Sequence, residues 1–180
     1  MIMQLSSALS AFDDAVTKLA ARLPQGVGPV MSWSSKIGLP PVGITILVTA
    51  LVYFVLADIG RSALTVLLVL IGTGIVDLIK RLVHRTRPDT VYVATKNPRG
   101  YSFPSGHAAD ALLVYGLLDY FSARYLPLTE AGVLIAVFTA FILVVSVSRV
   151  WLGAHFPSDI IGGWIIGGLW LLAAIAITQS

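Results

Sequence analysis

Long apolar stretches separated by short polar segments dominate this 180-residue chain. A helix needs about 20 mainly apolar residues to cross a bilayer, and five stretches approach or reach that length: 39–57, 62–80, 105–121, 131–148 and 160–180. The third is the weakest, because Asp110 and Asp119 interrupt it, but a charge near each end of a span can reach water or protein partners. The pattern predicts an all-α integral membrane bundle of about five transmembrane helices.

The N-terminal residues follow a different pattern, in which apolar residues recur at steps of three and four and polar residues occupy the other faces. We expect residues 1–24 to form an amphipathic helix that lies in the membrane interface or caps the bundle, because it is too polar to span. Residues 24–41 are rich in glycine and proline and are predicted to form a loop that enters the membrane. No repeat or linker divides the chain, so we expect one domain over residues 1–180, with the transmembrane bundle in residues 39–180.

Composition excludes several classes of protein. With 57% hydrophobic and 12% charged residues, the chain is too apolar for an ordinary soluble globule. The lack of cysteine excludes disulfides, thiolate nucleophiles and zinc–thiolate sites. A local basic cluster favours an anionic ligand there and argues against a general nucleic-acid surface. Six of the 12 Lys and Arg residues form this cluster: Lys80, Arg81, Arg85, Arg87, Lys96 and Arg99.

Three polar segments, Lys80–Pro88, Pro104–His107 and Ser148–Asp159, lie at the ends of predicted spans. The second span ends at the first of these segments, the third span begins at the next, and the fourth span ends at the last. Counting the crossings therefore places all three segments on one side of the membrane, together with the N-terminal helix. The C-terminus is expected on the opposite side.

The first two segments contain residue types that bind phosphate. Lys80 supplies a point charge and Arg87 a bidentate fork, and the proline that follows turns Arg87 away from the helix into a loop. Ser105 suits a helix N-cap, and Gly106 lets backbone N–H groups approach an anion closely. A helix N-terminus binds phosphate readily. His107 projects into the same space, where an imidazolium could protonate a leaving oxygen.

The third segment contains the candidate nucleophile. His155 precedes Asp159 by four residues, so the carboxylate can reach the imidazole if this part of the chain is helical. A carboxylate on one ring nitrogen fixes the tautomer and leaves the other nitrogen free to attack phosphorus. Arg149 adds a further positive charge, and the clustered charges can stabilise the transition state of phosphoryl transfer. We expect no metal and no other cofactor.

The three segments resemble the motifs of the type 2 phosphatidic acid phosphatases, also called lipid phosphate phosphatases, whose site is shared with vanadium haloperoxidases. The matching patterns are Lys80-x6-Arg87-Pro88, Pro104-Ser105-Gly106-His107 and Ser148-Arg149-x5-His155-x3-Asp159. The resemblance implies that His155 forms a phosphohistidine, that Asp159 orients it and that His107 protonates the leaving group. It also implies that phosphate is bound by Lys80, Arg87, Arg149, Ser105 and Gly106.

Several residues also have structural explanations. Basic residues near helix ends often only reach towards lipid headgroups, and we assign His84 a structural role. Asp110 either bonds to His107 or, as we favour, ends the polar cleft. Small residues in the last span are expected to allow close helix packing: Gly162, Gly163, Gly167 and Gly168.

Two other classes of function were weighed against a phosphatase. A small lipid or anion transporter could use the same charges, but transporters commonly have paired halves with broken helices, and none is visible in the sequence. A haloperoxidase would share the motifs, yet it should be soluble. The sequence therefore favours a membrane phosphatase.

A site at the mouth of a helical bundle suits a lipid phosphate better than a soluble sugar phosphate. The resemblance includes undecaprenyl-diphosphate phosphatases of cell-wall synthesis and the phosphatidylglycerophosphate or phosphatidate phosphatases of phospholipid metabolism. We favour undecaprenyl diphosphate, because the additional cations Arg85, Lys96 and Arg99 could hold a second phosphate. The other two lipids remain the alternative.

The orientation in the membrane involves a conflict. The side with the motifs has far more Lys and Arg than the opposite side, which has only Arg61 and Arg124, so the positive-inside rule taken literally places the site in the cytoplasm. Several of those charges serve catalysis, however, and are no topology signal. Because bacterial relatives usually work on the outer face, we expect a multi-pass protein of the inner membrane with its site on the periplasmic side.

Overall fold

The structure is a computed structural model that describes residues 2–38, 40–96, 98 and 100–179, with the side chains of residues 2–6 left undescribed. The described residues form helices and no strands. In chain order these are α1 (Ile2–Ala21), the 3-10 helix η1 (Gln25–Val27), α2 (Gly28–Ile37), α3 (Pro40–Leu56), α4 (Gly60–Val83), α5 (Val91–Lys96), α6 (Gly106–Tyr125), α7 (Leu128–Trp151) and α8 (Pro157–Gln179).

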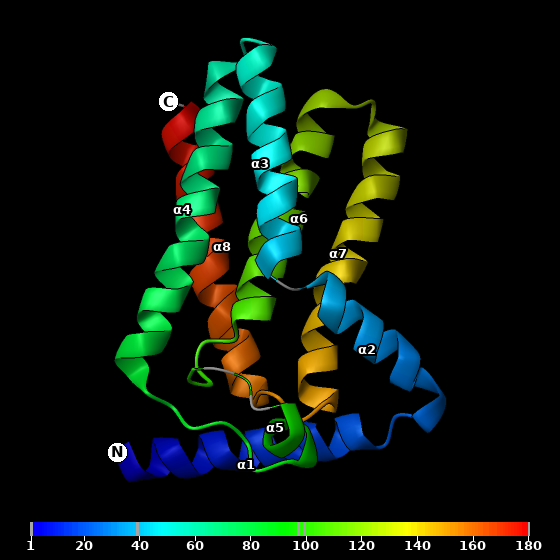
Figure 1. Ribbon diagram of the computed structural model, residues 1–180, viewed down its shortest axis with the longest axis vertical. Coiled ribbons are helices and arrows are strands. Elements are labelled where there is room, and N and C mark those ends of the chain that lie inside the picture. Colours follow the sequence, from blue (N-terminus) through cyan, green and yellow to red (C-terminus); the bar gives the residue numbers. More distant parts are fainter. Residues whose placement is uncertain (1, 39, 97, 99, 180) are drawn as a thin grey trace.

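Five long helices, α3, α4, α6, α7 and α8, run side by side, and α1 lies across one end of them (Figure 1). Helix α6 occupies the middle of the bundle, in contact with α3, α4, α7 and α8. The C-terminus is at the end opposite α1 (Figure 1). The prediction of an all-α membrane bundle with a separate N-terminal helix is confirmed.

Three of the described helices, α4, α7 and α8, are long and apolar enough to cross a membrane. The helical stretches 25–37 and 40–56, bent by 49° relative to each other, meet the same test when taken together as one span. Helix α6 is not among these candidates, and it carries Asp110 and Asp119. Its central position covers much of its surface with protein, which is how a polar helix can lie inside an apolar bundle. A fifth crossing by α6 stays a prediction.

The predicted loop over residues 24–41 is wrong for most of its length, because the structure has η1 and α2 there. Pro29 lies in the first turn of α2, where a missing N–H costs nothing, and Gly38 is its C-cap. The glycines and prolines thus mark the ends of a short helix. A side chain at residue 38 is also excluded by packing, since a Cβ there would lie 2.5 Å from Val145 Cγ1 on α7.

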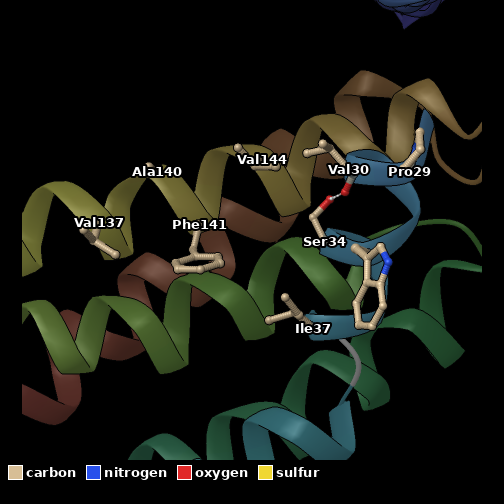
Figure 2. Close-up of a pocket in the computed structure, with 9 residues that line it drawn as sticks. Pro29, Val30, Ser34, Ile37, Val137, Ala140, Phe141 and Val144 are labelled. Atoms are coloured by element: carbon tan, nitrogen blue, oxygen red, sulfur yellow. Dashed lines mark hydrogen bonds between the residues drawn. The ribbon is translucent and has the colours of Figure 1, made fainter. Parts of the chain in front are cut away.

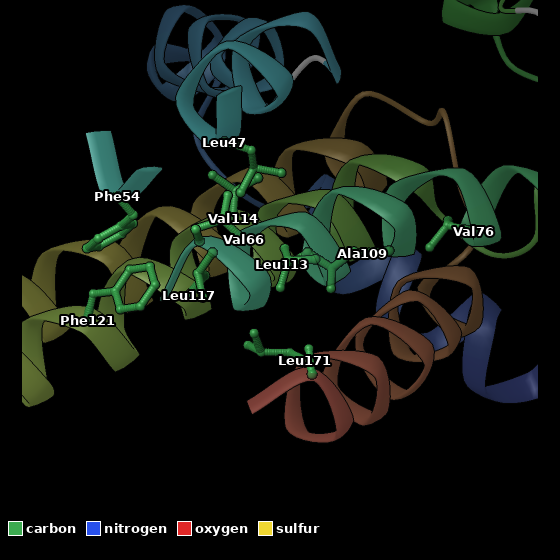
Figure 3. Packing of buried hydrophobic residues seen from close by; sticks show 13 residues of the cluster. Leu47, Phe54, Val66, Val76, Ala109, Leu113, Val114, Leu117, Phe121 and Leu171 are labelled. Carbon is green, nitrogen blue, oxygen red and sulfur yellow. The ribbon is translucent and has the colours of Figure 1, made fainter. Parts of the chain in front are cut away.

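The hydrophobic core joins α3, α4, α6 and α8 (Figure 3). Its most buried large side chains include Leu47, Val66, Leu113 and Leu117. This core fixes α6 between its neighbours and thereby fixes the position of the residues at its N-terminus.

Two glycines of α8 set how closely that helix approaches the start of α6. A Cβ at Gly163 would lie 2.7 Å from the carbonyl oxygen of Ser105, and one at Gly167 would lie 3.0 Å from that of Ala109. The small residues therefore serve helix packing, as expected. The close approach also brings the Ser105 backbone N–H within 2.9 Å of the Asp159 carbonyl oxygen.

Candidate active site

The three polar segments meet at the end of the bundle that α1 covers. The end of α4, the start of α6, the end of α7 and the start of α8 lie close to one another there (Figure 1). They bring in Lys80, Ser105 to His107, Arg149 and Asp159, while Arg87 and His155 lie in the connecting loops.

His155 and Asp159 form the pair that their spacing predicted. His155 Nδ1 lies 3.5 Å from Asp159 Oδ2, and both side chains are almost fully buried. The contact is made from a loop, because α8 begins only at Pro157. The turn before His155 depends on Gly153, which has a φ of +69° and stands where a Cβ would be 2.7 Å from the Thr90 side chain.

The other ring nitrogen of His155 faces a guanidinium. Arg87 Nη1 lies 3.1 Å from His155 Nε2 and donates to the Ala154 carbonyl oxygen at 3.0 Å, while Arg87 Nε donates to the Gly100 carbonyl oxygen at 3.2 Å. With Nδ1 directed at the carboxylate, Nε2 is the nitrogen that carries the lone pair, and in this structure the lone pair accepts the hydrogen bond from Arg87 Nη1. A phosphate bound by Arg87 would therefore lie next to the nucleophilic atom.

Two more cations complete the positive wall of the site. Lys80 Nζ lies 3.2 Å from the position that a Cβ would take at Gly106, so the glycine leaves room for the ammonium at the start of α6. Arg149 is 3% exposed and donates through Nη1 to Ser35 Oγ of α2. Its guanidinium carbon lies 5.7 Å from the centre of the Tyr92 ring.

Three buried polar atoms of this region have no hydrogen-bond partner among the described residues: Ser105 Oγ, His107 Nε2 and Arg149 Nε. A buried polar atom without a partner destabilises a fold by about 1–3 kcal/mol. A tetrahedral oxyanion offers several acceptors, and it could satisfy such atoms together. Ser105 is the N-cap residue of α6, as expected, but its side chain makes no capping hydrogen bond there.

Burial sets the protonation state of His155. It lowers the pKa of this imidazole from 6.5 to about 4, aided by the nearby charges of Arg87 and Arg149 and opposed by the hydrogen bond to Asp159. The imidazole is therefore neutral at pH 7, as a nucleophile requires. Burial also lowers the pKa of Arg87, with a further contribution from Arg149.

Sequence reasoning missed the residues that hold Asp159. Arg85 Nη1 donates to Asp159 Oδ1 at 2.7 Å, and Ser102 Oγ donates to Asp159 Oδ2 at 2.5 Å. Arg85 also pairs with Asp13 of α1 at 2.8 Å. Two carboxylates already occupy this guanidinium, which argues against the hypothesis that Arg85 helps to bind a second phosphate. In the sequence, the one sign of this contact was the position of Asp13 beside the apolar face of the N-terminal helix.

The other polar residues considered in the sequence lie around the candidate site. His84 ends α4 in a left-handed conformation, and its exposed ring meets Tyr101 edge-on. Asp110 is buried, and among the described residues it makes no hydrogen bond to His107. Lys96 is exposed on α5, and Arg99 lies outside the described residues.

Comparison with known proteins places this geometry in context. Residues 62–180 match the sequence model of the PAP2 superfamily. The chain is 28% identical over 172 residues to phosphatidylglycerophosphatase B of Bacillus subtilis, which covers 90% of this chain and 81% of that protein. It is 30% identical to an undecaprenyl-diphosphatase of Sulfolobus acidocaldarius over 77% of this chain and 64% of that one. A crystal structure of a transmembrane PAP2-type phosphatidylglycerolphosphate phosphatase from Bacillus subtilis superimposes with a TM-score of 0.81 at 25% identity, covering 96% of this chain and 87% of that one.

The lowered pKa of His155 predicts an unusual acid limit of activity. An imidazolium cannot attack phosphorus, so kcat/KM should fall on acidification with an apparent pKa near 4, well below the 6.5 of an ordinary histidine. Because the unfolded chain binds the proton more tightly, stability should also decrease as the pH falls from about 6.5 to about 4. The measurement is phosphate release in detergent as a function of pH, corrected for the ionisation of the substrate. An acid limb near 6.5 would contradict the assignment.

Proposed function

The chain belongs to the PAP2 superfamily, and on this premise we propose that it hydrolyses a lipid phosphate through a covalent phosphohistidine at His155. One observation carries the proposal. His155 is held by Asp159 through Nδ1 and faces Arg87 through Nε2. This is the arrangement that a histidine needs in order to attack a phosphorus atom bound beside it.

The reaction would proceed in two displacements. In the first, His155 Nε2 attacks phosphorus, the bond from phosphorus to the lipid oxygen breaks, and His107 gives a proton to the departing oxygen. In the second, water attacks the phosphohistidine, a proton goes back to His107, and inorganic phosphate leaves. Asp159 keeps the ring oriented and compensates the positive charge that the imidazole gains when it is phosphorylated.

Positive charge and backbone donors would stabilise the phosphoryl group during both steps. Lys80, Arg87 and Arg149 would surround its equatorial oxygens, and the backbone N–H groups of the first turn of α6, from Gly106 onward, would add donors there. The Ser105 N–H is not one of these donors, because it is bound to the Asp159 carbonyl oxygen. These groups are fixed before the substrate arrives, which is what makes such electrostatic stabilisation effective. The proposal requires no metal ion.

The mechanism predicts that phosphate release withstands excess EDTA and depends on His155. His155→Ala should reduce kcat by at least about a thousandfold, as is typical when the nucleophile of a covalent mechanism is removed. The wild type quenched during turnover should carry acid-labile, base-stable phosphate, and the variant should carry none. Loss of activity in EDTA, or full activity of His155→Ala, would refute the mechanism.

For the lipid, we propose a phosphate monoester such as phosphatidylglycerophosphate as the first candidate. Arg85 is occupied by carboxylates, which removes one of the three cations that suggested a diphosphate. The similarity to a phosphatidylglycerophosphatase over 90% of this chain supports the same choice. Undecaprenyl diphosphate is the second candidate, supported by the exposed Lys96 and by the similarity to an undecaprenyl-diphosphatase. The ratio of kcat/KM for the two lipids would decide between them.

An apolar groove between α2 and α7 offers a place for the hydrocarbon chain of the lipid (Figure 2). Its volume is about 540 Å³, and Val30 and Ile37 of α2 line it together with Val137, Phe141 and Val144 of α7. At 1.5 Å per residue, these α7 positions lie roughly 7 to 18 Å along the helix from Arg149, towards the middle of the bundle. Helix α2 also holds Arg149 through Ser35, so the groove and the phosphate site share both helices.

Filling the groove should impair long-chain substrates selectively. Ala140→Trp places a bulky ring in the groove, and we expect it to lower kcat/KM for a long-chain lipid phosphate by about tenfold, the equivalent of about two methylene groups left unburied. Activity towards the chain-free p-nitrophenyl phosphate should not change. Leu143→Trp is the matched control, because Leu143 is exposed on α7 outside the groove. Equal losses with both substrates would argue against a tail site.

We further propose that the protein lies in the inner membrane and that its active site opens on the periplasmic side. The support is the resemblance to bacterial relatives that work on the outer face, together with a catalytic role for the basic residues at this end. The charges of Lys80, Arg87 and Arg149 are explained by phosphate binding, so they do not count as cytoplasmic signals.

The lack of cysteine makes this orientation testable. Ala94 is exposed on α5 at the active-site end, and Thr129 is exposed at the start of α7 at the other end. An impermeant maleimide added to intact cells should label Ala94→Cys and leave Thr129→Cys unlabelled until the cells are opened. The reverse pattern would place the site in the cytoplasm.

A further inference from the structure

The interfacial helix α1 contributes a buried carboxylate to the neighbourhood of the active site. Asp13 is 3% exposed, although most described residues of α1 are exposed. Its Oδ1 accepts a hydrogen bond of 2.8 Å from the Ser158 backbone N–H, and its Oδ2 accepts one of 2.7 Å from the Ser158 hydroxyl and one of 2.8 Å from Arg85 Nη2. Asp13 is therefore bound both to the first turn of α8 and to the loop after α4.

Arg85 connects Asp13 to Asp159, the partner of His155. Its Nη2 binds Asp13, while its Nη1 binds Asp159 Oδ1 at 2.7 Å and the Ser158 hydroxyl at 2.7 Å. Its guanidinium carbon also lies 4.4 Å from the centre of the Phe156 ring. The planar fork is thus fixed on both sides by carboxylates, which gives strong and geometrically specific hydrogen bonds.

The carboxylate of Asp159 depends on Arg85 for one of its two oxygens. Oδ1 accepts from Arg85 Nη1, whereas Oδ2 accepts from Ser102 Oγ and from the Phe156 N–H and faces His155. If Arg85 turns away, Oδ1 loses its charged partner and the carboxylate is free to rotate. Arg85 has space for such a movement, because it lines a cavity of about 810 Å³ between α1, the end of α4 and α8.

We propose that Asp13 is a positioning residue, which acts through Arg85 to hold Asp159 and thereby the His155 ring in the reactive orientation. The N-terminal helix is then a working part of the active site in addition to its place at the membrane interface. This inference rests on the proposed role of His155 as the nucleophile.

A purely structural role for Asp13 must be separated from this one, because its carboxylate also caps α8. Asp13→Asn separates the two. The amide oxygen can still accept from the Ser158 N–H, whereas the amide nitrogen cannot accept from Arg85. Asp14→Asn is the matched control, since Asp14 is the exposed neighbour on the same helix and lines the same cavity.

We expect Asp13→Asn to lower kcat by about tenfold to a hundredfold, the range known for outer hydrogen-bond partners of metal-binding histidines. KM and the melting temperature should remain close to those of Asp14→Asn, and Asp13→Glu should recover most of the lost kcat, because it restores a carboxylate. In an Arg85→Met background, Asp13→Asn should cause little further loss, since the two residues act in series.

Three outcomes would overturn the proposal: equal kcat for Asp13→Asn and Asp14→Asn, a loss in Asp13→Asn that persists undiminished in the Arg85→Met background, or a loss that only follows the melting temperature. His155→Ala measured in parallel keeps the two proposals apart. If His155→Ala is inactive while Asp13→Asn matches its control, only the positioning role fails. If His155→Ala remains active, the phosphohistidine mechanism itself fails.

Discussion

The contacts of the Asp159 carboxylate are the constraint on which the arrangement of the active site depends. Arg85 binds one of its oxygens, and Ser102, the Phe156 N–H and the His155 ring gather at the other. These partners come from the loop after α4, the segment before α6 and the turn between α7 and α8. One fully buried carboxylate thus ties together elements that are far apart in the sequence. A buried charge is tolerated only when it is paired and hydrogen-bonded, so the same contacts that stabilise Asp159 also define the orientation of the His155 ring, the proposed nucleophile.

Like charges held close together are the second feature of the site. Lys80, Arg87 and Arg149 would repel one another, and the neighbouring carboxylates compensate them only in part, because Asp159 is shared with Arg85. A phosphate dianion would relieve this repulsion and give partners to the buried atoms that lack them. Before substrate binds, the packed core of the bundle holds the three cationic side chains in place, so they need to move little when it arrives.

The helices divide the work of the enzyme. The N-terminus of the central α6 lies where phosphate is proposed to bind, and the glycines of α8 let that helix approach closely enough to bring Asp159 to the same place. Helix α2, where the sequence suggested a loop, supports Arg149 through Ser35 and forms one wall of the apolar groove. Helix α1 lies across the site and supplies Asp13 (Figure 1). The proposed phosphate site and helix α1 therefore lie at one end of the molecule, and the apolar groove proposed for the lipid begins beside them.

The membrane bundle, the amphipathic N-terminal helix and the end of the bundle at which the motifs meet could all be predicted from the amino-acid sequence, because they follow from local hydrophobicity and from counting crossings. The spacing of His155 and Asp159 also predicted their pairing, because residues four apart lie on the same face of a helix; the contact exists, although His155 precedes the start of α8. The pairing of Arg85 with Asp13, which lie 72 residues apart, could not be predicted and is seen only in the folded chain. The folded chain also shows that residues 25–37 are helical. An ion pair between distant residues produces no periodic pattern in a sequence, because an aspartate or arginine can be either exposed or buried, and its residue type does not show which. Which of the two a residue becomes is settled when distant helices pack.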